Sequence, residues 1–127
     1  GRDSVLAALA DYRRGVPVLV VDDADRENEG DLLLAAEMAT PENVGFLVRH
    51  TSGVLCVSLP GRRLDELGLP PMVAHNEDPK GTAYAVSCDA RHGTTTGISA
   101  SDRAATCRVL AAASATAADL QRPGPVF

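Results

Sequence analysis

Six carboxylates stand within ten consecutive positions of this chain, between two apolar runs at 16–21 and 32–36. At an effective dielectric of ~20, two carboxylates about 5 Å apart repel each other by roughly 3 kcal/mol. A fold that gathers such charges therefore needs a divalent cation, a polyhydroxylated ligand or an arginine partner beside them. The acidic residues are Asp22, Asp23, Asp25, Glu27, Glu29 and Asp31.

The acidic segment has two interpretations. The simpler one is a solvated turn whose carboxylates never converge. The flanking apolar runs are typical of strands, which fix both ends of the turn, and this favours a binding site at 22–31. Oxygen donors suit Mg²⁺ or Mn²⁺ rather than zinc. An EF-hand is excluded, because Asn28 stands where that loop needs glycine and Leu34 where it needs a bidentate glutamate.

Size and composition predict one domain over residues 1–127. The chain is 45% apolar but only 3% aromatic, so its core must be built from Val, Leu, Ile and Ala. A net charge of −5 and the lack of a basic stripe argue against a nucleic-acid partner. No stretch approaches the ~18 apolar residues of a membrane span. The three cysteines are odd in number and share no metal-ligand spacing, which indicates a reduced, cytoplasmic setting.

Hydrophobic periodicity and turn signals predict an α/β chain. We expect an α+β sandwich with a mixed twisted sheet and helices on its faces, because some connections are too short for crossovers. The predicted helices span 4–14, 41–50, 61–67 and 99–113, with one further turn at 116–120. The predicted strands span 17–22, 32–36, 54–59 and 82–88. The last residues, 122–127, resemble a turn followed by the start of another strand, so we expect a C-terminal part or a partner chain to complete it.

Other polar residues carry weaker signals. The turn at 94–97 leads into a helix N-terminus, where backbone N–H groups can bind an anion, although a plain capping segment is the better explanation from the residues alone. Cys56 is expected to pack within a strand. Asp102 and Arg103 are expected to compensate the helix dipole and to form an ion pair. The histidines are expected at the surface: His50, His75 and His92.

The segment Asp22–Leu32 closely resembles the signature of the 3,4-dihydroxy-2-butanone 4-phosphate synthase family of riboflavin biosynthesis. Four further stretches match that family in the same order. They are Arg49–Gly53, Gly81–Tyr84, Thr95–Arg103 and Arg122–Gly124. The resemblance covers nearly the whole chain.

This resemblance implies the family's fold and its Mg²⁺-dependent (or Mn²⁺-dependent) conversion of D-ribulose 5-phosphate to L-3,4-dihydroxy-2-butanone 4-phosphate and formate. It implies homodimers whose sites draw residues from both subunits. By matching position, Glu27 is the metal ligand and also contacts the sugar. The other residues implied in substrate binding are Arg26, Asp31 and Thr95. Those implied in catalysis are Asp22, Glu29 and Thr96.

Two departures from the family pattern stand out. The family motif at the end of this chain reads Arg-Pro-Gly-His-Val with a catalytic histidine, and Pro125 occupies that place here. The family's later Gly-His-Thr-Glu segment, which supplies a second metal ligand, is not among these residues. We therefore expect this polypeptide alone to be inactive or severely impaired. The alternative function is that of a degenerate family member, which binds or dimerises or serves a specialised pathway.

Overall fold

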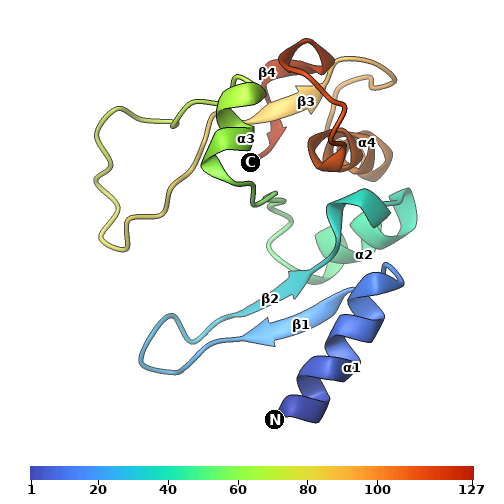
Figure 1. The fold of residues 1–127 in the computed structure, drawn as a ribbon, viewed down its shortest axis with the longest axis vertical. Coiled ribbons are helices and arrows are strands. Elements are labelled where there is room, and N and C mark those ends of the chain that lie inside the picture. The colour runs from blue at the N-terminus through green and yellow to red at the C-terminus, as the bar shows by residue number, and fades with distance from the viewer.

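The computed structural model describes residues 1–127 (Figure 1). Its elements follow the expected alternation of helices and strands, and the α+β class is confirmed. In chain order they are α1 (Arg2–Arg13), β1 (Val18–Val21), β2 (Gly30–Leu33), the 3₁₀ helix η1 (Ala36–Met38), α2 (Pro41–His50), α3 (Gly61–Glu66), β3 (Cys88–Ala90), α4 (Ala100–Ala111), the 3₁₀ helix η2 (Ala117–Asp119) and β4 (Leu120–Val126).

The helix starts at 41 and 100 follow the sequence signals. Thr40 caps α2: its hydroxyl accepts from the N–H of Asn43, whose side chain in turn accepts from the N–H of Thr40. Ser99 caps α4 by accepting from the N–H of Asp102. Helix α1 begins two residues before the predicted start, with Gly1 as its N-cap. Capping chemistry therefore sets the two helices that lie nearest the core.

The strands form two separate two-stranded sheets, each antiparallel: β1 with β2, and β3 with β4. The pairing is nevertheless mixed, because Leu55 forms a parallel bridge with Val126, which itself pairs antiparallel with Cys88. The predicted strand 54–59 is reduced to this bridge. The predicted strand 82–88 is wrong for most of its length, since β3 starts only at Cys88. The apolar run at 54–59 and the alternation at 82–88 indicate strands, but little of the backbone in either segment finds a ladder partner.

Thirteen buried residues form the core, and they are mostly aliphatic as the composition predicts. Helix α4 lies between α2 and the β3–β4 sheet and supplies Ala104, Cys107 and Leu110. Helix α2 contributes Val44 and Leu47 from its predicted apolar stripe. This packing makes the upper part of the molecule in Figure 1 a single body around α4.

The lower part of the molecule is less covered. Helix α1 has no buried residue, although Val5, Leu6, Leu9 and Tyr12 share one face as predicted. Strand β1 was expected to be buried on both faces, and this is wrong: Leu19 is 67% exposed. Figure 1 shows the reason: the β1–β2 hairpin projects away from the α4 body, and only Leu32 and Leu34 at its end reach the core.

An open groove of about 1360 Å³ separates the two parts. Helix α1 and the β1–β2 hairpin line one side of it, and α2 with the segment 54–58 lines the other. The acidic segment connects β1 to β2, so the groove leads to the predicted site. No helix in this fold combines the length and the apolar character that crossing a membrane requires.

Candidate functional site

The acidic segment forms a turn organised around the carboxylate of Asp22. Its Oδ2 accepts from the backbone N–H of Glu27 at 3.0 Å and from Nη1 of Arg26 at 2.9 Å, and its Oδ1 accepts from the N–H of Glu29 at 2.9 Å. The Glu29 N–H is the main cause that holds the pKa of Asp22 below its usual value, with help from Glu27 and Arg26 against the opposing effect of desolvation. Asp22 is therefore ionised at neutral pH and fixes the shape of the turn.

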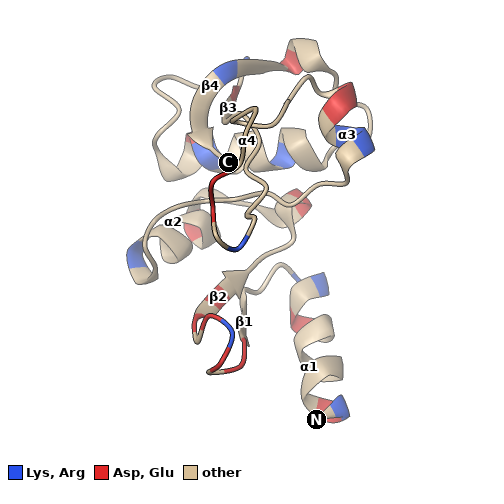
Figure 2. Cartoon of the chain, turned by 90° about the vertical axis from the view of Figure 1, so that its left-hand side faces the viewer, with Lys and Arg blue, Asp and Glu red and all other residues tan.

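The backbone of the turn is equally defined. The N–H of Arg26 donates to the carbonyl of Asp23 at 3.0 Å, and the N–H of Asp22 donates to the carbonyl of Glu29 at 3.3 Å. Asn28 adopts a φ of 54°, in the left-handed region that asparagine enters more readily than most residues. These contacts argue against a loose, fully solvated loop. Figure 2 shows the acidic residues gathered at this end of the hairpin.

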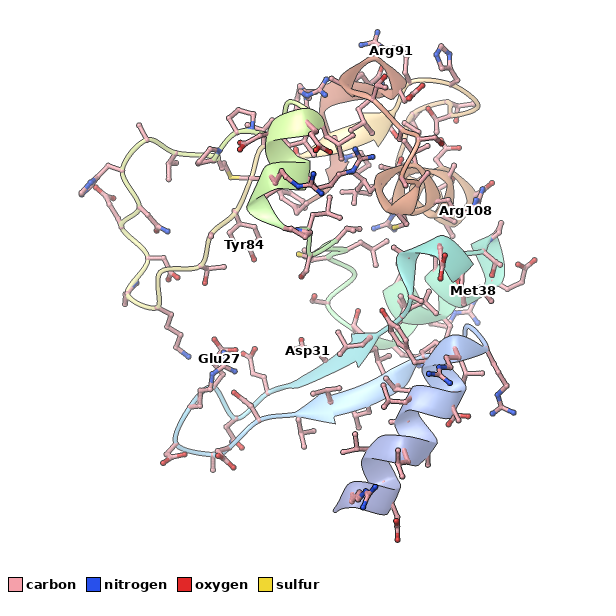
Figure 3. The ribbon with its side chains drawn as sticks, in the orientation of Figure 1. Glu27, Asp31, Met38, Tyr84, Arg91 and Arg108 are labelled. Atoms are coloured by element: carbon pink, nitrogen blue, oxygen red, sulfur yellow. The ribbon has the colours of Figure 1, made fainter.

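Glu27 lies at the tip of the hairpin between two cations. Its carboxylate is 3.8 Å from Nη1 of Arg26 and 3.6 Å from Nζ of Lys80, and its side chain keeps 31% of its surface exposed. Lys80 belongs to the loop 71–84, whose tip lies above the hairpin turn in Figures 2 and 3. Sequence reasoning missed Lys80, because a single lysine in a polar loop carries no spacing signal.

Asp31 and Glu29 line the groove at the start of β2. Cys56 lines the same groove from the segment opposite. Desolvation, and then the negative charge of Asp31, raise the pKa of the Cys56 thiol. Cys56 was expected to pack inside a strand, and this is wrong: the residue is exposed. Figure 3 shows Asp31 and Glu27 on the side of the hairpin that faces the rest of the chain.

The turn at 94–97, here called the threonine turn, forms a second polar cluster around Asp102 of α4. The Asp102 carboxylate accepts from the N–H groups of Thr95 and Gly97, each at 2.9 Å, and from the Thr95 hydroxyl at 3.1 Å. The Thr95 N–H is the main cause that lowers the pKa of Asp102. The N–H groups that could bind an external anion are thus occupied by a carboxylate of the chain itself, as in a plain capping segment.

This second cluster is separate from the acidic turn in these 127 residues. No hydrogen bond or ion pair joins Thr95 or Thr96 to the segment 22–31, and Figure 1 places the two turns toward opposite ends of the molecule. The predicted ion pair of Asp102 with Arg103 is not formed either. Arg103 instead donates from Nη1 to the carbonyl of Gly53 at 2.9 Å. The histidines are exposed as expected.

The acidic turn has the right donor chemistry for a hard divalent cation. Its free oxygens are carboxylates, and Glu27 keeps a partly exposed carboxylate that attracts two cationic side chains. No three His, Cys, Asp or Glu side chains converge as a metal cage. Mg²⁺ does not require one, because it commonly takes one or two carboxylates and completes its shell with water and substrate oxygens. The residues therefore fit Mg²⁺ held by one protein ligand.

Comparison with known proteins identifies the family. The family model described as 3,4-dihydroxy-2-butanone 4-phosphate synthase matches residues 6–127. A riboflavin biosynthesis protein RibBA from Nocardia farcinica is 62% identical over 98% of this chain and 30% of its own length. The RibBA protein of Mycobacterium tuberculosis is 60% identical over 98% of this chain and 29% of its own.

Solved structures give the same result. A crystal structure of 3,4-dihydroxy-2-butanone 4-phosphate synthase in complex with two magnesium ions superposes with a TM-score of 0.94 at 52% identity, covering 97% of this chain and 57% of that one. The synthase of Candida albicans superposes with a TM-score of 0.86 at 49% identity, covering 96% and 59%.

The chain spans about 30% of the length of the RibBA relatives that it matches. Within that span the match is continuous and includes the acidic turn, the threonine turn and β4. The chain therefore belongs to the 3,4-dihydroxy-2-butanone 4-phosphate synthase family.

Proposed function

We propose that this chain supplies the metal-binding and sugar-binding turn of a 3,4-dihydroxy-2-butanone 4-phosphate synthase. The reaction is the Mg²⁺-dependent conversion of D-ribulose 5-phosphate to L-3,4-dihydroxy-2-butanone 4-phosphate and formate, with Mn²⁺ as an alternative ion. The observation that carries the proposal is the ordered acidic turn, in which Asp22 fixes the backbone that presents Arg26 and Glu27. One solved relative that superposes on this chain is described with two magnesium ions.

Each residue of the turn has a role that follows from its contacts. Glu27 would hold the ion, and the ion would polarise adjacent sugar oxygens as a Lewis acid. Arg26 can contact sugar or phosphate oxygens with the donors that Asp22 leaves free. Asp31 and Glu29 face the groove, where carboxylates can accept sugar hydroxyl protons. Because Asp22 already accepts three hydrogen bonds, we assign it the positioning of the turn.

The threonine turn needs a second subunit to join this site. Thr95 is held by Asp102, and the turn 94–97 precedes α4 rather than the β1–β2 hairpin. We infer a homodimer in which the turn 94–97 of one protomer completes the partner's acidic turn. The exposed apolar surface of α1 and β1 supports association. A cytoplasmic location is part of the proposal, supported by three cysteines that form no disulfide.

A second candidate function rests on Pro125. Proline carries no titratable group, so it cannot replace the family's histidine in proton transfer. On this account the chain keeps the fold and the sugar-binding turn but has lost turnover, and it acts as a binding or dimerising subunit. The position is half-buried in β4.

An assay of formate release from ribulose 5-phosphate by the polypeptide that carries these residues separates the two functions. Turnover that requires Mg²⁺ and is lost in Glu27→Gln supports the synthase. Binding of ribulose 5-phosphate without formate release supports the degenerate subunit. If the chain shows neither binding nor turnover at any Mg²⁺ concentration, the proposed function is wrong.

A further inference from the structure

The loop that approaches the acidic turn is closed at its base. The N–H of Met72 donates to the carbonyl of Tyr84 at 2.9 Å, and the N–H of Val86 donates to the carbonyl of Pro70 at 2.8 Å. An antiparallel β-bridge between Pro71 and Ala85 lies between these two hydrogen bonds. The loop thus leaves and rejoins the body at one place, as a compact surface loop does. Every residue from 71 to 84 is exposed, so packing does not hold the loop down.

The tip of this loop has a fixed internal shape. The carboxylate of Asp78 accepts from the N–H of Thr82 at 2.7 Å, and the Asp78 carbonyl accepts from the N–H of Gly81 at 2.9 Å. The side chain of Asn76 accepts from the N–H of Asp78 at 2.9 Å and donates to the carbonyl of Thr82 at 3.0 Å. These bonds enclose Lys80 in a tight turn and fix the direction from which its side chain extends.

Lys80 is the only residue of the loop that forms an ion pair with the acidic turn. Its Nζ lies 3.6 Å from Oε1 of Glu27. It is also the only lysine among the 127 residues. Both side chains remain partly exposed, at 56% for Lys80 and 31% for Glu27. An ion pair of this kind is weak and is readily exchanged for another cation.

We propose that Lys80 is a positioning residue that latches the loop 71–84 onto Glu27, and that a divalent cation at Glu27 displaces it. The inference deepens the proposed function and rests on Glu27 as the metal ligand. In the metal-free protein the ammonium group neutralises the carboxylate and holds the loop over the turn. When the ion binds, the loop is released and access to the acidic turn changes.

The physical argument is charge competition at one carboxylate. The Glu27 carboxylate already has Arg26 at 3.8 Å and Lys80 at 3.6 Å. A divalent cation bound at Glu27 would therefore be repelled by both of these positive charges. Arg26 is retained by its hydrogen bond to Asp22, whereas Lys80 has no other ion pair. The least anchored cation leaves first. Removing Lys80 should therefore strengthen divalent-ion binding rather than weaken it.

The single lysine makes the latch directly observable. Reductive ¹³C-methylation of the 127-residue chain labels Lys80 and the N-terminal amine and retains the positive charge of both. The NMR signal of Lys80 is assigned by its loss in Lys80→Arg. We expect it to shift in Glu27→Gln and on saturation with Mg²⁺, while the N-terminal signal stays constant. Glu77→Gln is the matched control, because it removes a charge from the same loop without touching an ion pair, and it should leave the Mg²⁺-induced shift intact.

Calorimetric titration with MgCl₂ gives an independent readout. Lys80→Met should bind Mg²⁺ about two- to fivefold more tightly than the unsubstituted chain, the range expected for the loss of an exposed competing ion pair. Lys80→Arg, which keeps the charge, should bind Mg²⁺ as the unsubstituted chain does. Circular dichroism verifies that each variant retains its fold.

Three results overturn the inference. They are a Lys80 signal that is the same in Glu27→Gln, a signal that does not respond to saturating Mg²⁺, and Lys80→Met that binds Mg²⁺ no more tightly. Formate release that depends on Mg²⁺ while the Lys80 signal stays fixed overturns the latch and leaves the proposed function standing. A displaced Lys80 signal without any turnover supports the latch and counts against the synthase activity.

Discussion

Gly124 of β4 lies directly against the backbone of Cys88 in β3. A Cβ atom at position 124 would overlap the Cys88 carbonyl group and the following N–H. The same place carries the bulge between Cys88 and Asp89. The glycine of the motif at 122–124 is thus required by the close approach of two strands, whatever its part in chemistry.

Replacing Gly124 by alanine should therefore break the β3–β4 pairing. Because the clash is with backbone atoms, we expect a loss of about 3 kcal/mol in the free energy of unfolding, at the upper end for overpacking. Gly61→Ala is the matched control: nothing lies within 4 Å of its added Cβ in α3, so we expect a gain of up to about 1 kcal/mol. Urea denaturation measures both. Equal effects of the two substitutions would contradict the account.

The sequence predicted the helices better than the strands, for a physical reason. Thr40 and Ser99 cap their helices through hydrogen bonds to residues three positions later, so both partners can be recognised in the local sequence. Strand formation depends on a partner elsewhere. The segment 54–59 is an apolar run bounded by a turn, but it finds only the bridge of Leu55 with Val126. Strand β1 was predicted to be buried because it is apolar, but it is largely exposed, since burial depends on which other elements pack against a strand.

The candidate site was predictable where the residues are contiguous. The acidic turn could be located from its sequence, and its resemblance to a known signature assigned roles to Arg26 and Glu27. The contact of Lys80 with Glu27 spans 53 positions and has no local signal. The role of Asp102 as acceptor for Thr95 and Gly97 was likewise hidden, because a carboxylate in a first helical turn has a simpler local explanation.

The free energy of unfolding should fall in acid, because the carboxylates of Asp22 and Asp102 become protonated. Hydrogen bonds from the N–H groups of Glu29 and Thr95 lower the folded-state pKa values of Asp22 and Asp102 below those of the unfolded chain. Their contribution is therefore fully present above an unfolded pKa of about 3.9 and is lost as the pH falls through the folded values. Unfolding free energies measured from pH 7 to pH 3 should decline below about pH 4. Asp102→Asn should make that decline shallower, and stability that rises on acidification would refute this assignment.

Pro125 is expected to limit turnover. In the polypeptide that carries these residues, Pro125→His should raise formate release from ribulose 5-phosphate by about 10²-fold or more, the usual contribution of a positioned acid or base. Pro125→Ala is the control, since it removes the proline without adding a titratable group. A similar gain in both variants would show that the proline ring, rather than the missing imidazole, limits the rate.

The apolar face of α1 should promote self-association of the 127-residue chain. Leu9 is 51% exposed and lines the open groove with its neighbours on that face. Leu9→Glu should shift sedimentation toward the monomer. Val73→Glu changes an equally exposed residue outside the groove, at 54%, and should leave the sedimentation profile unchanged. The same monomeric profile for the unsubstituted chain and for Leu9→Glu would contradict this expectation.

The central claim is that the acidic turn uses Glu27 to hold a divalent cation together with a sugar phosphate. Calorimetric titration of ribulose 5-phosphate into the chain, with and without Mg²⁺, tests it most directly. We predict binding that depends on Mg²⁺ and that weakens at least about tenfold in Glu27→Gln, as expected when a ligand of the metal is removed. Binding of equal affinity with and without Mg²⁺, or unchanged by Glu27→Gln, would contradict the claim.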